Sequence, residues 1–583
     1  MATTSQKHVA SISILIDGTD IPPELRQVLL EVKVKESVAV PSSAYLRFND
    51  PGLKQVDKPV FEIGKEIEIR AGGLADTSKQ AIFKGEIVAF EPEFTKGGCI
   101  IALRAYDQSH RLQRARKVRT FQDVTATDIV KRLTQEAGLT GSADPTSAKF
   151  KFFLQSGESD RELIRRFERE YNFHFFVENG SYKFRSATAA GASIATLKYG
   201  ESLHSFRPRI SSAQQVNQVE VRGWDPAQKR EIASTATNGG TISKPGLQRS
   251  KVANAFSGHK VLLADRVIEN SQEAQKVAQA AIDEFAEAYV EAEGQCLGNP
   301  KLHAGKKVKI EGVGTKLSGE YVLTAVTHWY RGEKGYYTNF EITGHSARGL
   351  LDLVHKPEKR DWASHPVVAL VTNVNDPDKL GRVKVKYPVL PDDKTSQPAE
   401  SFWARIVTTA ASNNRGLLML PELDDEVLVV FENGDARRPL IVGALFNGRN
   451  KPNDELLQTQ DGSFAVVSNK KGFVHTKEDL TFKSDKKMIL QITGDREEKT
   501  DANMKSEAAS SAKLKAGTSY EIEAGSSMTI KGASVTVEAS GSLKLKGATV
   551  DIESQGPATL KGATVDVQGQ AMTNIKGAIV NLG

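Results

Sequence analysis

The sequence predicts a mainly β protein with a minor α+β part, in which barrels precede a C-terminal trimeric β-helix, or β-prism. Two observations favour this fold class. Runs of alternating apolar and polar residues, punctuated by glycine and proline, fill most of residues 10–450. The tripeptide Lys-Gly-Ala then returns at 531, 546, 561 and 576, and a fixed period of this kind is typical of stacked repeats.

Residues 1–120 are predicted to form a β-barrel, because short alternating runs follow one another there. The runs are 12–16, 32–34, 45–48, 67–69, 82–88 and 101–107. A basic cluster follows, made of Arg111, Arg114, Arg116, Lys117 and Arg119. It lacks the interleaved aromatic residues of a base-stacking groove, so we interpret it as a solvated or subunit-contact surface and expect no nucleic acid.

Residues 121–190 are predicted to be an α+β segment. Thr125 with Asp128, and Ser159 with Glu162, are start signals for two helices. Asn179-Gly180 then predicts the turn of a β-hairpin. Residues 191–355 are predicted as a second barrel region around one helix, 272–293, that stops at Gly294.

Residues 356–455 are predicted to form a small OB-like barrel, since five apolar runs separated by proline and glycine turns fit that fold. The runs are 367–371, 381–385, 402–407, 426–431 and 440–445.

Residues 456–583 are predicted to be a repetitive β-helix, in which the Lys-Gly-Ala period is fifteen residues. An apolar residue precedes each lysine and an alternating apolar pair follows each tripeptide, so alternate side chains face opposite ways. The predicted core positions are Ile530, Val535, Val537, Leu545, Val550, Ile552, Leu560, Val565, Val567, Ile575, Val580 and Leu582. The predicted turn residues, expected at tight corners that favour positive φ, are Gly532, Gly547, Gly562 and Gly577.

The composition of this repeat predicts its oligomeric state. About four inward apolar side chains per period, with almost no aromatic residues, are few for a closed single-chain coil. Three copies wound around one axis would give a core narrow enough for valine, isoleucine and alanine to fill. We therefore predict an intertwined trimeric β-prism. A single-chain β-helix or a disordered tail are the alternatives, and apolar residues kept in phase argue against disorder.

The overall composition is that of a globular protein, with 39% hydrophobic and 26% charged residues in a chain of 583. A length of this order predicts about four domains. Cys99 and Cys296 lie far apart and are expected to be buried and unpaired. The N-terminus does not resemble a secretory signal, so we expect assembly in the cytoplasm.

The region 375–452 resembles the VgrG spike proteins of type VI secretion and related contractile injection systems, together with their phage tail-spike relatives. The matching stretches are 375–385, 402–405, 416–421, 424–429, 431–439 and 443–452. The N-terminal half is similar to the hub of that family over 105–107, 110–112, 119–121, 159–163, 291–294 and 298–300. The Lys-Gly-Ala repeats extend the resemblance over nearly the whole chain.

The resemblance implies a homotrimer with a hub that mates to a hexameric tube protein and to baseplate components, an OB-fold collar, and a spike that contacts the target membrane mechanically. It also implies a PAAR-type tip protein at the C-terminal end, with Val580, Asn581, Leu582 and Gly583 as expected contacts. The resemblance further implies that the chain is part of a tail-like injection particle and is delivered outside the cell or into the target on contraction, with effector cargo as a possible further partner.

No motif for catalysis is present. The sequence contains no phosphate-binding Gly-x-x-x-x-Gly-Lys-Ser/Thr loop, no His-Glu-x-x-His helix and no Gly-x-Ser-x-Gly elbow. His174 and His328 are interpreted as structural. We therefore predict no enzyme, no catalytic residue, no cofactor and no metal. Relatives with an inserted lysozyme domain differ here, because only a short polar segment follows Pro452. The alternatives are a spike that bears an effector or a cell-wall hydrolase, and an adhesin with a solenoid stalk.

Overall fold

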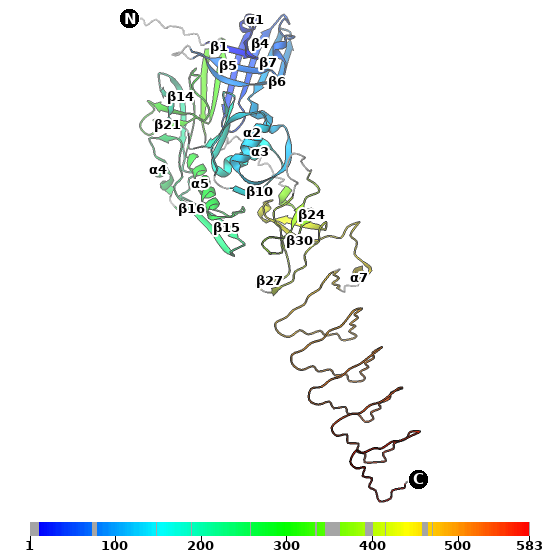
Figure 1. Cartoon of the computed structure of the whole chain (residues 1–583). Helices are drawn as coiled ribbons and strands as arrows, with labels where there is room; N and C mark the ends of the chain where they lie inside the picture. Colours follow the sequence, from blue (N-terminus) through cyan, green and yellow to red (C-terminus); the bar gives the residue numbers. More distant parts are fainter. Residues whose placement is uncertain are drawn as a thin grey trace, which may run out of the picture. The chain divides into compact units, whose positions relative to one another are not determined.

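The computed structural model describes residues 11–581, apart from 73–77, 147–148, 188, 190, 257, 333–334, 344–361, 391–399, 414, 458–463 and 469. The N-terminal stretch, the predicted boundary near 355, and the predicted tip residues Leu582 and Gly583 lie outside this range. The chain divides into two units, Met1–Lys470 and Lys471–Gly583 (Figure 1).

An antiparallel sheet of eleven strands is the frame of the hub, residues 11–343. In spatial order its strands are β14 (Leu203–Ile210), β19 (Val290–Leu297), β23 (Gly335–Ile342), β22 (Ala325–Arg331), β3 (Leu29–Ser37), β4 (Ser43–Asp50), β7 (Gly98–Tyr106), β6 (Gln80–Thr95), β5 (Glu66–Ala71), β1 (Ile12–Ile16) and β2 (Thr19–Asp20). Strands β22 and β3 pair from Ala325 with Ser37 to Arg331 with Glu31. The two predicted barrel regions therefore share one curled sheet.

Two apolar cores line this sheet. One contains alternate residues of β4, Ala44, Leu46 and Phe48, together with the inward residues of β5 and β7. The other lies under β19, β22 and β23. Cys99 belongs to the first core and Cys296 to the second, and both are free and buried, which confirms the prediction for the cysteines.

The three local signals predicted between 121 and 190 are present in the structure. Helices α2 (Ala126–Glu136) and α3 (Asp160–Tyr171) begin with complete capping boxes at Thr125 and Ser159. Asn179 and Gly180, with φ of 51° and 77°, turn the hairpin. The strands of this segment are β8 (Arg116–Thr125), β9 (Thr140–Ala143), β10 (Lys149–Ser159), β11 (Phe173–Glu178) and β12 (Ser181–Ser186).

The helix predicted at 272–293 is shorter than expected. Helix α5 runs over Ser271–Glu287 and Val290–Leu297 is strand β19, so the predicted stop at Gly294 was wrong. Residues of β19 alternate between buried and more exposed positions, and sheet pairing decides their state. Gly294 faces Phe340, and a Cβ there would lie 2.3 Å from its ring. Glycine is needed here for strand packing.

Helix α5 packs on a small sheet of β16 (Arg230–Ala236), β15 (Gln218–Asp225) and β18 (Lys260–Leu263). The remaining hub elements are α1 (Pro23–Gln27), η1 (Pro59–Phe61), η2 (Gln108–Gln113), β13 (Ser193–Lys198), β17 (Lys244–Pro245), α4 (Arg249–Ala253), η3 (Asn254–Phe256), β20 (Lys307–Glu311) and β21 (Gly319–Val322).

The collar, residues 362–457, is a five-stranded barrel. Its strands follow the order β25 (Lys384–Lys386), β24 (Val367–Asn373), β29 (Glu426–Phe431), β30 (Pro439–Ala444) and β26 (Arg405–Ile406). Bridges from Val383 to Ala404 and from Lys386 to Glu400 connect the first strand to the segment before the last. The sheet therefore closes, as the sequence predicted. Its short elements are η4 (Trp362–Ser364), β27 (Ala411–Ser412), β28 (Arg415–Gly416), η5 (Glu432–Gly434) and α7 (Asp454–Leu457).

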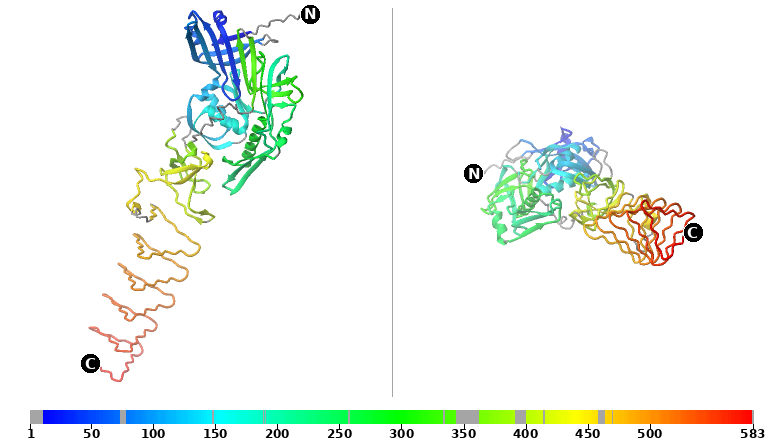
Figure 2. Two further views of the ribbon diagram at one scale, coloured as in Figure 1. Left: turned by 180° about the vertical axis from the view of Figure 1, so that it is seen from behind. Right: turned by 60° about the horizontal axis from the view of Figure 1, so that its bottom comes forward.

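The repeat unit, residues 471–581, is an extended chain that winds in successive open turns (Figure 2). Within these residues there are bends but no paired strands, and every side chain is exposed. The predicted β-helix is therefore not seen in the single chain.

Candidate functional site

A loop built around one carboxylate joins β24 to β25 in the collar. Asp376 accepts hydrogen bonds from the backbone N–H groups of Asp378, Leu380 and Arg382, at 3.1, 2.8 and 3.2 Å. The guanidinium of Arg382 also donates to both of its oxygens, at 2.6 and 3.0 Å. These contacts hold the pKa of Asp376 well below its usual range, with the Arg382 side chain as the main cause. The loop 375–385, one of the stretches that carried the family resemblance, is thus held in shape by hydrogen bonds among its own residues.

We expect Asp376→Asn to destabilise the collar by about 2 kcal/mol, because the amide loses the charge-assisted bonds to Arg382. The Asp376 side chain is only 4% exposed. Asp378→Asn is the matched control, since Asp378 also contacts Arg382 but is 66% exposed. Urea unfolding of both variants checks this. Equal midpoints for the two variants would contradict a supporting role for Asp376.

The collar exposes a row of apolar side chains beside this loop. Leu417, Leu418, Met419 and Leu420 are between 46% and 67% exposed, and Leu380 is 67% exposed. The space above Gly381 is bordered by Leu418 and Leu420. A patch of this kind on a water-facing surface is typical of a protein interface.

The repeat unit exposes far more apolar surface. The described core positions of the Lys-Gly-Ala repeats are between 46% and 82% exposed in the single chain. They are Ile530, Val535, Val537, Leu545, Val550, Ile552, Leu560, Val565, Val567, Ile575 and Val580. Among the tip positions, Val580 and Asn581 are exposed. Soluble monomers rarely expose so long an apolar series, which makes this series a candidate interaction surface.

The four repeat glycines do not adopt the positive φ that the sequence predicted. A Cβ on Gly532, Gly547, Gly562 or Gly577 would instead lie between 2.9 and 3.2 Å from the carbonyl oxygen two residues further on. The corner is made by a close backbone approach that only glycine permits without displacement. The same geometry recurs in all four repeats.

The upstream half of the repeat unit carries a second period that the sequence reasoning missed. Apolar residues recur there at a spacing of eight, and the spacing itself could have revealed them. The first series contains Leu480, Met488, Met504, Ala512, Tyr520 and Met528, with Arg496 between Met488 and Met504. The second contains Phe482, Leu490, Leu514, Ile522 and Ile530, with Glu498 and Ser506 between Leu490 and Leu514.

The basic cluster of the hub is largely compensated by acidic neighbours. Its ion pairs are Arg111–Glu86, Arg116–Glu162, Lys117–Asp160, and Arg119 with both Glu136 and Asp160. Arg119 is only 3% exposed, so the predicted solvated surface was wrong for this residue. Its role is to tie β8 to α2 and α3.

Glu36, His303 and His328 lie together where β3 meets β22. The carboxylate of Glu36 contacts Nδ1 of His303 at 3.0 Å. His328 Nε2 contacts the carbonyl oxygen of Leu302 at 3.0 Å, and its Nδ1 lies 2.7 Å from the Tyr336 hydroxyl. Each nitrogen of His328 therefore has a protein partner, consistent with the structural role that the sequence predicted.

This cluster predicts acid sensitivity of the hub. Burial, with a contribution from nearby His303, lowers the pKa of His328 to about 3. The unfolded chain has an ordinary histidine pKa of about 6.5 and takes up a proton first as pH falls. Stability is therefore complete above pH 6.5 and decreases below it, by about 1.4 kcal/mol per pH unit. His303 affects stability in the opposite direction. Burial lowers its pKa, but the hydrogen bond to Glu36 outweighs burial and raises the pKa overall. The contribution of protonated His303 to folding stability is therefore lost only as pH rises.

Urea unfolding at pH 7 and pH 5, followed by tryptophan fluorescence, measures this slope. His328→Gln should be less stable than wild type at pH 7 but should lose less stability between the two pH values. An unchanged slope in the variant would show that another group controls the acid response.

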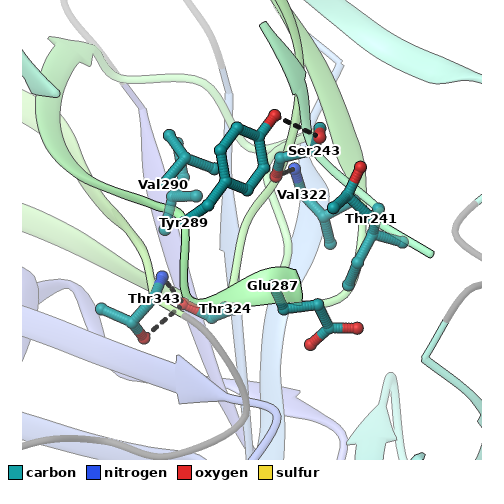
Figure 3. A pocket seen from close by; sticks show the side chains of 10 residues that line it. Thr241, Ser243, Glu287, Tyr289, Val290, Val322, Thr324 and Thr343 are labelled. Carbon is teal, nitrogen blue, oxygen red and sulfur yellow. Dashed lines mark hydrogen bonds between the residues drawn. The ribbon is translucent and has the colours of Figure 1, made fainter. Parts of the chain in front are cut away.

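Two small cavities lie in the hub, each with a volume of about 10 Å³. Figure 3 shows the first, where the Tyr289 hydroxyl donates to the backbone oxygen of Ser243 at 3.2 Å and Thr343 N–H donates to Thr324 at 2.9 Å. Such a volume holds at most about one water molecule. Neither cavity can accommodate a substrate.

A buried charged junction fastens the collar to the hub. Arg437, in the turn before β30, pairs with Asp435 at 2.8 Å and with Glu273 of α5 at 3.4 Å. It also donates to the backbone oxygen of Val267 at 3.3 Å. Burial raises the pKa of Asp435, but the charge of Arg437 outweighs burial and lowers this pKa overall. Phe152 and Leu154 of β10 complete the junction by packing in the collar core.

No helix among the described residues is long and apolar enough to cross a membrane.

Comparison with known proteins identifies two regions. Residues 6–331 match the family model described as the Alg8 N-terminal domain, which covers more than half of the chain. Residues 367–446, the collar, match the model of the type VI secretion system/phage-baseplate injector OB domain. This match confirms the predicted OB-like barrel.

Several curated relatives are VgrG proteins. The type VI secretion system spike protein VgrG1b of Pseudomonas aeruginosa is 24% identical over 360 residues, which cover 58% of this chain and 48% of that protein. The actin cross-linking toxin VgrG1 of Vibrio cholerae is 23% identical, covering 59% of this chain and 33% of that protein. The chain thus spans about half or less of the length of these relatives. The second name shows that a structural family of this kind can include effector-bearing members.

Solved structures with similar folds include a type VI secretion component of Escherichia coli, with 16% identity, a TM-score of 0.47, and coverage of 74% of this chain and 99% of that one. A chain of the half-lidded Francisella PdpA–VgrG complex has 11% identity, a TM-score of 0.47 and 80% coverage of both chains. From the family matches and the curated relatives we conclude that the chain belongs to the Alg8 N-terminal domain family and is a VgrG-type spike protein related to phage-baseplate proteins.

Proposed function

We propose that this chain is the structural hub and spike of a contractile injection machine, and that it acts as a homotrimer whose repeat units form a membrane-piercing β-prism. The observation that carries the proposal is the long series of exposed apolar side chains in the repeat unit. Two more copies of the same repeat are the partners that match its period at every layer. The resulting core would be shared by all three chains.

A shared core suits mechanical work. When three chains contribute to every layer, one strand cannot detach without exposing the apolar side chains of the other two. Local fraying is then costly, and the spike resists the force of contraction. The exposed collar row 417–420 supports the same assembly, because three collars around an axis would cover it.

The resemblance to VgrG spike proteins supports three further kinds of partner. The hub would mate to a hexameric tube protein and to baseplate components, and the C-terminal end of the prism would carry a PAAR-type tip protein. Assembly would take place in the cytoplasm, and the particle would carry the spike, with any effector cargo, to the target membrane. No catalytic residue is assigned.

Light scattering on the purified full-length chain tests the central step. We expect a mass three times the 63.5 kDa of the chain, held through dilution to nanomolar concentration. A chain truncated before Lys531 lacks the Lys-Gly-Ala core and should dissociate more readily. A full-length chain that is monomeric would rule out the shared core and, with it, the proposed spike.

A further inference from the structure

One segment of the repeat unit has charged residues at both positions of the apolar pattern. Bends recur every eight residues at 477, 485, 493, 501, 509, 517, 525 and 533. Each segment between two bends holds one position of each eight-residue series, and from 480 to 530 these positions are apolar except for Arg496, Glu498 and Ser506. In the strand between the bends at 493 and 501, these two positions hold Arg496 and Glu498.

Both charged side chains lie on the same side of the strand. The guanidinium of Arg496 forms an ion pair with the carboxylate of Glu498. Residues i and i+2 of an extended strand share a face, and the spacing of eight assigns that face to the side of Met488, Leu490 and Met504. A prism of three chains would therefore bury three arginines and three glutamates in one layer.

We propose that this Arg496–Glu498 layer sets the register in which three chains assemble, and the inference rests on the trimer proposed above. The neighbouring layers cannot set it. A chain displaced by a multiple of eight residues would again place uncharged side chains, apolar except for Ser506, against one another in these layers. The charged layer occurs once among the eight-residue strands, so only the correct alignment brings the three pairs together.

Hydrogen-bond capacity explains why misalignment is costly. A guanidinium has five N–H donors, and one carboxylate of the same chain can accept from only part of them. In register, the carboxylate of the adjacent chain accepts from the rest, and a closed ring of charge-assisted bonds forms. Out of register, each pair would be surrounded by apolar side chains with donors unsatisfied. A buried polar layer that specifies alignment at some cost in stability is known from coiled coils.

The full-length chain offers a matched control. Lys505 and Glu507 form a second i, i+2 ion pair at 2.7 Å in the next strand, but they alternate with Met504 and so face outward. Register is read from a spin label on Ser510→Cys, at a bend, by pulsed electron paramagnetic resonance. Cys99 and Cys296 are buried and stay unlabelled. Three chains in register give a single label-to-label distance, and a displaced chain adds a second one.

We expect wild type and the Lys505→Met/Glu507→Leu control to give one distance. Arg496→Met/Glu498→Leu should remain trimeric and at least as resistant to heat, but should give two or more distances. Glu498→Leu alone should yield at least about tenfold less SDS-resistant trimer, because three buried arginines lose their partners, and the double variant should restore it.

Two results would overturn the inference in a trimeric wild type: a single distance in the apolar double variant, or a Glu498→Leu variant as resistant as the outward control. A monomeric wild type would instead overturn the proposed function. The two failures are therefore distinguishable.

Discussion

Val537→Asp is expected to convert the trimeric full-length chain largely to monomer. Val537 lies in the apolar series of the Lys-Gly-Ala repeats, so the substitution would bury three carboxylates in one layer of the prism. Each unpaired buried charge costs several kcal/mol, and together they exceed what one layer of valine and isoleucine contributes. Light scattering over a dilution series measures the loss of trimer.

The adjacent residue supplies the control. Thr536 lies between Val535 and Val537, so its side chain should face outward. Thr536→Asp adds the same charge to the same strand and should leave the trimer intact. If both aspartates dissociate the trimer equally, the assigned faces are wrong; if neither does, this layer is not a core layer.

Arg437→Ala is expected to weaken the attachment of the collar to the hub by about 3–5 kcal/mol. The substitution removes the cation that pairs with both Asp435 and Glu273, so each of these part-buried carboxylates loses that ion pair. Hydrogen exchange in the first turns of α5 and around β30 should therefore accelerate.

Arg438 provides the comparison for this junction. It lies next in sequence and approaches Glu269 at 4.0 Å, where one oxygen–nitrogen contact near the surface contributes little. Arg438→Ala should lower the free energy of opening, as measured by hydrogen exchange, by less than about 1 kcal/mol. Equal protection in the Arg437 and Arg438 variants would mean that the apolar contacts of Phe152 and Leu154 hold the junction without the ion pair.

The features that could be predicted from the residues share a local origin. The capping boxes at Thr125 and Ser159 and the Asn179-Gly180 turn depend on neighbours within a few positions, and all three formed as expected. The collar strands were recognisable because each apolar run is bounded by its own turn. The core and tip positions of the repeat stay predictions, because a single chain does not bury them.

Long-range partners could not be inferred in this way. The pairing of β3 with β22 joins residues nearly three hundred positions apart. Backbone hydrogen bonds are the same for almost every residue type, so the sequence does not indicate which strands will pair. The same holds for Arg437, whose partner Glu273 lies on a helix of the hub. Ala292 fits a helical stripe as well as a strand, and the pairing of β19 with β14 and β23 decided between them.

The sequence by itself determined the class of the protein, its collar and the period of its repeat, because local turns and regular spacing of apolar residues encode these directly. The tertiary structure decided the single hub sheet, the end of α5, the charged junction and the reason for glycine at the repeat corners. Each of these depends on which distant atoms come into contact. A Cβ at Gly547 would lie 3.0 Å from the Thr549 carbonyl oxygen, and that distance exists only in the folded turn.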